Sequence, residues 1–146
     1  MRPNPISDWF HRTVGMWRSE RTYIFSPDGK PQLFTTMMDI FHDDEVPQGY
    51  VIKWEGRTTG EMRVSLDGNV LRRSRDYFGN GAHDSEVSML DDDTIVLRTE
   101  YDNVKYFEEI RLASHDNYRL RRTFGTKADG SFALYGAYCE FRIPNQ

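Results

Sequence analysis

The chain has few of the features that most often reveal a function. It has one cysteine, Cys139, so it cannot form an internal disulfide, and such usage is typical of a reducing compartment. No apolar run reaches the roughly 18 residues of a membrane-spanning helix. Residues 1–10 lack the apolar segment of a secretory signal. We therefore expect a cytoplasmic protein that does not span a membrane.

Positive charge is scarce as well. The chain has 19 Lys and Arg against 23 Asp and Glu, a formal net charge of -4. Nucleic-acid surfaces are normally basic, so we expect no nucleic-acid partner and no attraction to an anionic membrane. The four histidines are scattered, with no i,i+4 pair and no cysteine at ligand spacing, and the acidic run Asp91–Asp93 lacks the glycine of a calcium loop. We expect no metal site.

Short alternating segments separated by turn residues fill most of the chain. Side chains that alternate between apolar and polar indicate half-buried strands, and the aromatic content of 14% suits both strands and an apolar pocket. A chain of 146 residues provides one core of ordinary size, so we expect a single domain, residues 1–146. The predicted strands cover residues 18–25, 33–41, 50–56, 62–66, 70–77, 86–90, 95–101, 104–112, 118–124 and 131–143.

A short helix is predicted before these strands, with Ser7 as its N-cap, Asp8 in its first turn and Gly15 at its end. Its apolar residues, among them Trp9 and Phe10, need a surface to cover, and the end of a barrel would provide one. Because closing an antiparallel meander removes exposed edges, the predicted fold is an all-β, up-and-down barrel of about ten strands with a short N-terminal helix.

The stretch from Val104 to Thr123 carries the candidate site. It is predicted to form two strands joined by the turn Ser114–Asn117. On the first strand Glu108 shares a face with apolar residues, and on the second Arg119 and Arg121 share a face. A carboxylate among apolar residues needs a partner, and a guanidinium group matches it in geometry. For any single arginine of the predicted strands, an ion pair with a surface Asp or Glu is about as good an interpretation as a place in a ligand site. For Cys139 we favour a buried packing role over a reactive thiol.

Two segments resemble a known family. The run Trp17-Arg18-Ser19-Glu20-Arg21-Thr22 after Gly15 is similar to the W-x-S-Q-R-T opening of the CpcS/CpeS family, the S-type phycobiliprotein chromophore lyases, and Gly15-x-Trp17 resembles the start of calycin (lipocalin-like) barrels. The C-terminal third resembles the family pattern in order and spacing: Thr99-Glu100-Tyr101, Glu108-Glu109, Ala113-Ser114, Asn117, Arg119-Leu120-Arg121 and Tyr138-Cys139-Glu140-Phe141-Arg142-Ile143. Glu20 replaces the family's Gln, and Arg111-Leu112 replaces an aromatic pair. The turn after Ser114 is one residue longer, which leaves both Glu108 and Glu109 as candidates for the functional acid, although face alternation favours Glu108.

The resemblance implies a ten-stranded calycin barrel that binds a linear tetrapyrrole (bilin), phycoerythrobilin or phycocyanobilin, and attaches it through a thioether to a cysteine of an apo-phycobiliprotein subunit. Glu108 and Arg119 would be catalytic. Glu108 would accept hydrogen bonds from pyrrole N–H groups, and Arg119 and Arg121 would pair with the propionates. The bilin-binding residues expected from this comparison are Arg121, Trp54, Arg18, Arg21, Glu140 and Tyr106. A purely structural role in the core is as good an interpretation of Trp54.

Two other functions use the same fold. The barrel could be a non-catalytic carrier or chaperone of a bilin, haem or fatty acid, or a lipocalin-like interaction domain with an empty barrel. A lyase would act in the cytoplasm of a cyanobacterium-like cell or in a plastid stroma. Exterior aromatic residues such as Tyr135 and Phe141 could be buried in a homodimer.

Overall fold

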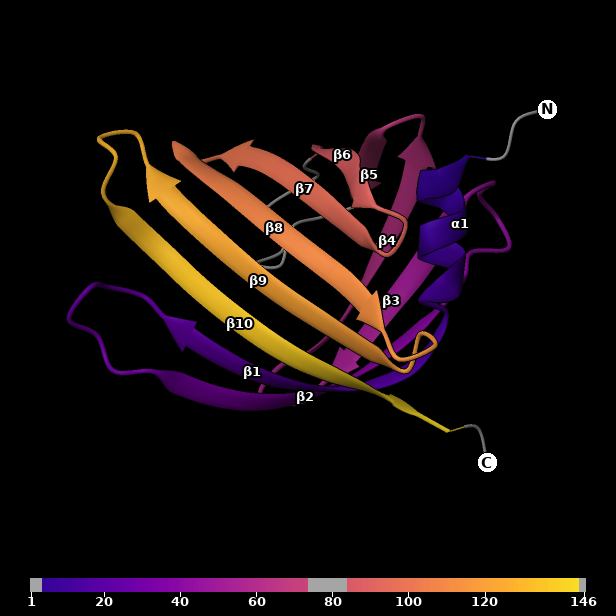
Figure 1. Cartoon of the computed structure of the whole chain (residues 1–146), viewed down its shortest axis with the longest axis horizontal. Helices are drawn as coiled ribbons and strands as arrows, with labels where there is room; N and C mark the ends of the chain where they lie inside the picture. The colour runs from indigo at the N-terminus through magenta and orange to yellow at the C-terminus, as the bar shows by residue number, and fades with distance from the viewer. Residues whose placement is uncertain (1–3, 74–83, 145–146) are drawn as a thin grey trace.

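A computed structural model describes residues 4–73 and 84–144, which form ten antiparallel strands and one helix (Figure 1). The elements are α1 (Pro5–Arg12), β1 (Gly15–Ile24), β2 (Gln32–His42), β3 (Gly49–Glu55), β4 (Thr59–Asp67), β5 (Val70–Arg73), β6 (Asp84–Asp91), β7 (Thr94–Tyr101), β8 (Val104–Ala113), β9 (Tyr118–Lys127) and β10 (Phe132–Ile143). Each strand pairs with the next, and β1 pairs with β10 to close the barrel. The predicted fold class is confirmed. The predicted strand 70–77 extends beyond the described residues.

The apolar core fills the end of the barrel that α1 covers. Figure 1 shows α1 lying across one end, opposite the loops that follow β1 and β9. Trp9 and Phe10 of the helix are buried against inward-facing residues of the strands, and the fully buried Trp17 lies near the start of β1. Burying such aromatic side chains contributes about 2–3 kcal/mol each, which is enough to hold an eight-residue helix that would not form alone. No helix within the described ranges is long and apolar enough to cross a membrane.

Ion pairs fasten the helix to the turns at this end. The Arg12 guanidinium lies 2.7 Å from Asp116 in the β8–β9 turn and 2.7 Å from Asp93 in the β6–β7 turn. Arg142, near the end of β10, donates to the carbonyl oxygens of Asp116, Val14 and Arg12. These bonds tie the helix and the turns into one closed end, so a ligand would have to enter from the opposite end.

The helix begins three residues earlier than predicted. Asn4, not Ser7, is the N-cap: its side-chain oxygen accepts from the backbone N–H groups of Ile6 and Ser7 at 3.0 and 3.4 Å. Pro5 then takes the first helical position, where its missing N–H costs nothing. Gly15 does not end the helix. It begins β1 with a φ of +137°, a backbone conformation that other residues rarely adopt.

The position of the N-cap predicts which polar side chain at the start of the helix contributes to stability. We expect Asn4→Ala to lower the free energy of unfolding by about 1 kcal/mol, because two N–H groups lose their acceptor. Ser7→Ala is the matched control, since it keeps the carbonyl that Tyr50 contacts and removes no capping bond. Urea unfolding followed by circular dichroism measures both. A larger loss for Ser7→Ala would contradict the assignment.

Candidate functional site

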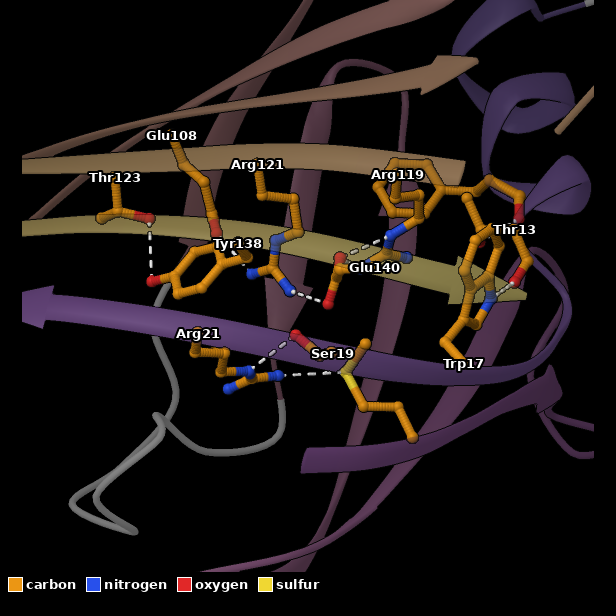
Figure 2. Close-up of polar contacts among 12 residues, drawn as sticks. Thr13, Trp17, Ser19, Arg21, Glu108, Arg119, Arg121, Thr123, Tyr138 and Glu140 are labelled. Carbon is orange, nitrogen blue, oxygen red and sulfur yellow. Dashed lines mark hydrogen bonds and ion pairs between the residues drawn. The ribbon is translucent and has the colours of Figure 1, made fainter. Parts of the chain in front are cut away.

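Inward-facing charged side chains lie together on neighbouring strands of the barrel, above the apolar core. Glu108 comes from β8, Arg119 and Arg121 from β9, and Glu140 from β10 (Figure 2). The strand register explains why these side chains are close. Glu140 of β10 is directly opposite Arg119 of β9, and Arg121 is two residues further along β9, on the same face as Arg119. All four side chains are buried. The sequence-based prediction that Glu108, Arg119 and Arg121 face one another is confirmed.

Arg121 links the two acids. Its Nη2 lies 2.6 Å from Glu108 Oε2, and its Nη1 lies 3.4 Å from Glu140 Oε2. Arg119 donates from Nε to the other oxygen of Glu140 at 2.9 Å, and its Nη2 lies 2.8 Å from the same oxygen. Figure 2 shows Arg121 between the two carboxylates. Buried charges are tolerated only when paired in this way, so the four groups form one network.

Both acids are ionised at neutral pH. Burial raises the pKa of Glu140, but Arg119 and Arg121 more than offset it, so the pKa falls to about 2. Burial likewise raises the pKa of Glu108, and Arg121, with help from Arg73 and Arg119, brings it below its ordinary value. The network therefore holds two ionised carboxylates, each paired with arginine, and neither carboxylate is a proton donor at neutral pH.

The two acids differ in access. Glu140 has no exposed surface, and both of its oxygens accept from arginines. The Glu108 side chain is 12% exposed, and only its Oε2 accepts a hydrogen bond from a described residue. Its Oε1 is not among the buried polar atoms that lack a partner, so this oxygen keeps accessible surface. Glu108 can thus accept a hydrogen bond from a ligand. Glu140, whose two oxygens are both occupied, is better placed to hold Arg119 and Arg121 in position.

Tyr138 and Arg21 extend the network toward the open end. The Tyr138 ring lies between two guanidinium groups, with Arg121 at 4.7 Å and Arg21 at 5.4 Å from its centroid. Burial raises the pKa of the Tyr138 phenol, which donates to Thr123. Arg21 donates to Ser19 Oγ at 2.9 Å and contacts the Met38 sulfur at 3.2 Å. Arg21 therefore faces into the barrel, and its expected contact with a bilin stays a prediction.

Trp54 and Tyr106 lie nearer the open end and are half-buried. The Trp54 ring covers Gly60 on the neighbouring strand so closely that a Cβ there would lie 2.3 Å from the indole. Tyr106 stacks on Tyr101 with ring centroids 5.8 Å apart. Trp54 is partly buried and packs against the core from its edge. The packing role is therefore observed, and the bilin contact stays a prediction.

Arg18 is the predicted site residue that the structure places elsewhere. It lies on the outer face of β1, exposed, 3.1 Å from Glu20 and over the ring of Phe141. The reason is alternation: Trp17, Ser19 and Arg21 point inward, so Arg18 must point outward. The same rule places Glu109 on the outer face, where it pairs with Arg122 at 2.8 Å, and leaves Glu108 inside the barrel.

Cys139 also lies on the outer face. It is exposed, so the predicted packing role is wrong. The preceding and following residues of β10 point inward, which leaves Cys139 in an outer groove of about 560 Å³ that runs over β1, β2, β8, β9 and β10. Outward-facing residues such as Glu109, Leu120 and Arg122 line this groove, and Arg21, Arg121 and Tyr138 of the charged network also border it.

Sequence reasoning missed several members of the network: Ser19, Arg73, Ser85, Thr99, Thr123 and Tyr138. Extending the alternation from Glu140 to Tyr138 and from Arg121 to Thr123 would have found two of them. The four histidines are not all scattered, as their spacing in the sequence suggested. His11 Nδ1 and His42 Nε2 lie 3.0 Å apart at the end of the helix. Across the described residues, no three or more His, Cys, Asp or Glu side chains gather as a metal site would require.

Comparison with known protein families matches the strands that carry most of these residues. The model of the CpeS-like protein family matches residues 57–143, which include all of β8, β9 and β10. The chain belongs to the CpeS-like family. The CpeS-like match covers more than half of the chain and contains the buried acids and both arginines that contact them. The family resemblance seen in the sequence is therefore confirmed.

Individual relatives cover nearly the whole chain. It is 27% identical to "Putative phycocyanobilin lyase CpcS 2" of Nostoc sp., over 94% of this chain and 91% of the relative. It is 23% identical to "Putative chromophore lyase CpcV" of Picosynechococcus sp., over 97% of this chain and 83% of the relative.

Solved structures share the CpeS-like fold. The S-type phycobiliprotein lyase CPES from Guillardia theta superposes with a TM-score of 0.74 at 18% identity, covering 100% of both chains. Rv2717c from M. tuberculosis gives a TM-score of 0.60 at 12% identity, over 96% of this chain and 98% of that one. At such identities the similarity shows the fold alone, so function has to be argued from the site.

Proposed function

We propose that this protein is a bilin lyase, which binds a linear tetrapyrrole such as phycoerythrobilin or phycocyanobilin inside the barrel and promotes its thioether attachment to a cysteine of a phycobiliprotein subunit. The observation that carries the proposal is the ionised Glu108, held by Arg121 with one oxygen still accessible. Membership of the CpeS-like family and the names of the two relatives support it.

The geometry suits the chemistry of a bilin. Its row of pyrrole N–H groups needs an acceptor, and a fixed carboxylate also favours the protonated, cationic chromophore. Protonation makes the conjugated system a better electrophile. Rings such as Tyr138, Tyr106 and Trp54 offer apolar surface beside the charges. Arg119 and Arg121 already face carboxylates of the barrel, which favours a role in fixing those acids over the propionate contacts expected from the sequence.

The attachment step needs no nucleophile from this chain. The acceptor cysteine's sulfur forms a bond to the exocyclic ethylidene carbon of the bilin, and a proton ends on the neighbouring ring carbon, so the thiol adds across a double bond. Nothing is oxidised and nothing leaves. The contribution of the barrel is to bind the bilin in one conformation, keep it protonated and present its reactive end to the acceptor.

A transfer assay tests the proposal. The protein is incubated with phycocyanobilin, or with phycoerythrobilin, and a recombinant apo-phycobiliprotein subunit, and the product is denatured in acidic urea. We expect bilin to remain on the subunit with a thioether-type absorption spectrum. Spontaneous addition without the protein should be slower and give a mixed product. A subunit whose acceptor cysteine is changed to alanine is the control for non-covalent carry-over.

Two results would contradict the proposal. Bilin that is bound but never transferred indicates a carrier, and no change in bilin absorbance at all indicates a barrel with another function. The described end of the barrel opposite α1 is where transfer would occur, because Arg12 and Arg142 fasten the other end.

A further inference from the structure

In the part of the chain that the structure describes, more positive than negative charge faces the inside of the barrel. Among the described residues, the charged side chains around the network are Glu108, Glu140, Arg21, Arg73, Arg119 and Arg121. Four guanidinium groups against two carboxylates leave two positive charges in excess. Arg142 does not belong to this set, because it lies against Trp17 at the closed end and is held by carbonyl oxygens.

The excess charge resides on Arg21 and Arg73. The two carboxylates are engaged by Arg119 and Arg121. Within residues 4–73 and 84–144, Arg21 and Arg73 make no ion pair: Arg21 donates to the hydroxyl groups of Ser19 and Tyr23, and Arg73 donates to that of Ser85, which is bonded in turn to Thr99. Hydroxyl groups orient these guanidinium groups but do not neutralise them.

Arg73 is the more informative of the two because it is 8% exposed. Burying a guanidinium without a counter-ion is costly, so a paired or ligand-bound state is expected to be preferred. Among described residues it makes one side-chain hydrogen bond, to Ser85, which leaves other N–H groups over, yet none of its nitrogens is among the buried polar atoms without a partner. The remaining N–H groups of Arg73 therefore reach accessible space.

The two arginines lie on different walls. Arg21 is in β1 and Arg73 ends β5, and β2, β3 and β4 separate these strands in the closed sheet. The two cations also lie near different carboxylates, because Arg73 acts electrostatically on Glu108 and Arg21 acts on Glu140. A ligand that neutralised both would need two anionic groups on flexible arms.

We propose that Arg21 and Arg73 each bind one carboxylate of a dianionic ligand, so that the barrel selects a tetrapyrrole with both propionates free. The inference rests on the proposed function and adds Arg73 to it as a specificity-determining residue. Arg119 and Arg121 then keep their carboxylate partners when the ligand binds.

Phycocyanobilin and its dimethyl ester test the assignment, because esterification removes both charges and leaves the conjugated chain intact. Binding is measured by visible absorbance titration. We expect the wild-type protein to bind the diacid at least ten-fold more tightly than the diester. Arg73→Gln, which can still bond Ser85, should weaken diacid binding about ten-fold and diester binding little. Arg72→Gln is the matched control, since Arg72 is the neighbouring residue of β5, faces outward and pairs with Asp67 and Asp84.

The outcomes separate the two proposals. If the wild-type protein binds both compounds equally well, the inference is wrong while the proposed function stands. If it binds neither, the proposed function fails as well. Equal weakening of both compounds by Arg73→Gln would reduce Arg73 to a structural role. Should that variant not fold, Arg73→Lys, which keeps the charge, must retain the preference for the diacid, and the wild-type comparison needs no variant.

Discussion

Glu108→Gln is expected to reduce the rate of bilin transfer to the acceptor subunit by about 10²- to 10⁴-fold, the range typical of losing a group that controls protonation. The amide has nearly the same shape, but it carries no charge and offers only one acceptor. It could not stabilise a protonated bilin. Initial rates of covalent product, measured at saturating bilin, would show the loss.

The fold should survive this substitution, because Arg121 keeps its second contact, to Glu140 at 3.4 Å. Glu109→Gln is the matched control: it changes the next residue of the same strand, which faces outward and pairs with Arg122. Its rate should stay near that of the wild type. The absorbance of bound bilin gives an independent measure, since loss of protonation shifts the long-wavelength band to shorter wavelength. Transfer by Glu108→Gln within three-fold of the wild-type rate would exclude Glu108 from the chemistry.

The sequence was sufficient for the parts of this site that depend on alternation. Period-two alternation along a strand fixes which side chains share a face, so Glu108, Arg119 and Arg121 could be placed inside without coordinates. The same rule, applied to the first strand, would have excluded Arg18. The family motif suggested that residue as part of a contiguous run, and a contiguous run in a strand always contains residues of both faces.

Contacts between strands distant in sequence could not be obtained in this way. Ion pairing between Arg121 and Glu140 depends on the register of β9 against β10. Arg73 enters the site only because the sheet curves into a barrel, which brings β5 within electrostatic reach of Glu108 on β8 although β6 and β7 lie between them. Alternation does not predict which arginines form ion pairs with carboxylates, as Arg119 and Arg121 do, and which donate only to hydroxyl groups, as Arg73 does among the described residues. The prediction of the helix N-cap was wrong for a local reason. Asn4 and Ser7 are both residue types that cap helices well, and only the hydrogen bonds of the first turn distinguish them.

Glu140→Gln should destabilise the protein by about 3–5 kcal/mol at pH 7, because it leaves Arg119 and Arg121 buried next to a neutral amide. Acid should reproduce the effect in the wild type. The folded-state pKa of Glu140 is about 2, below its ordinary value of 4.5. The stabilisation is therefore complete above pH 4.5 and is lost as the pH falls toward 2, with a contribution of about 3 kcal/mol. Urea unfolding at a series of pH values measures this slope, and Glu140→Gln should flatten it.

A double variant decides whether the buried charges serve stability or function. Arg119→Met with Glu140→Leu replaces the pair by apolar groups of similar volume, and such exchanges are often neutral for stability even where breaking the pair is costly. We expect the double variant to regain most of the stability that Glu140→Gln loses, yet to transfer bilin poorly, because Arg121 would then turn wholly to Glu108 and move its accessible oxygen. Equal instability of the single and double variants would instead mean that the ion pair itself stabilises the barrel. In the first case, the charges of the barrel are explained by the ligand they hold and not by the fold.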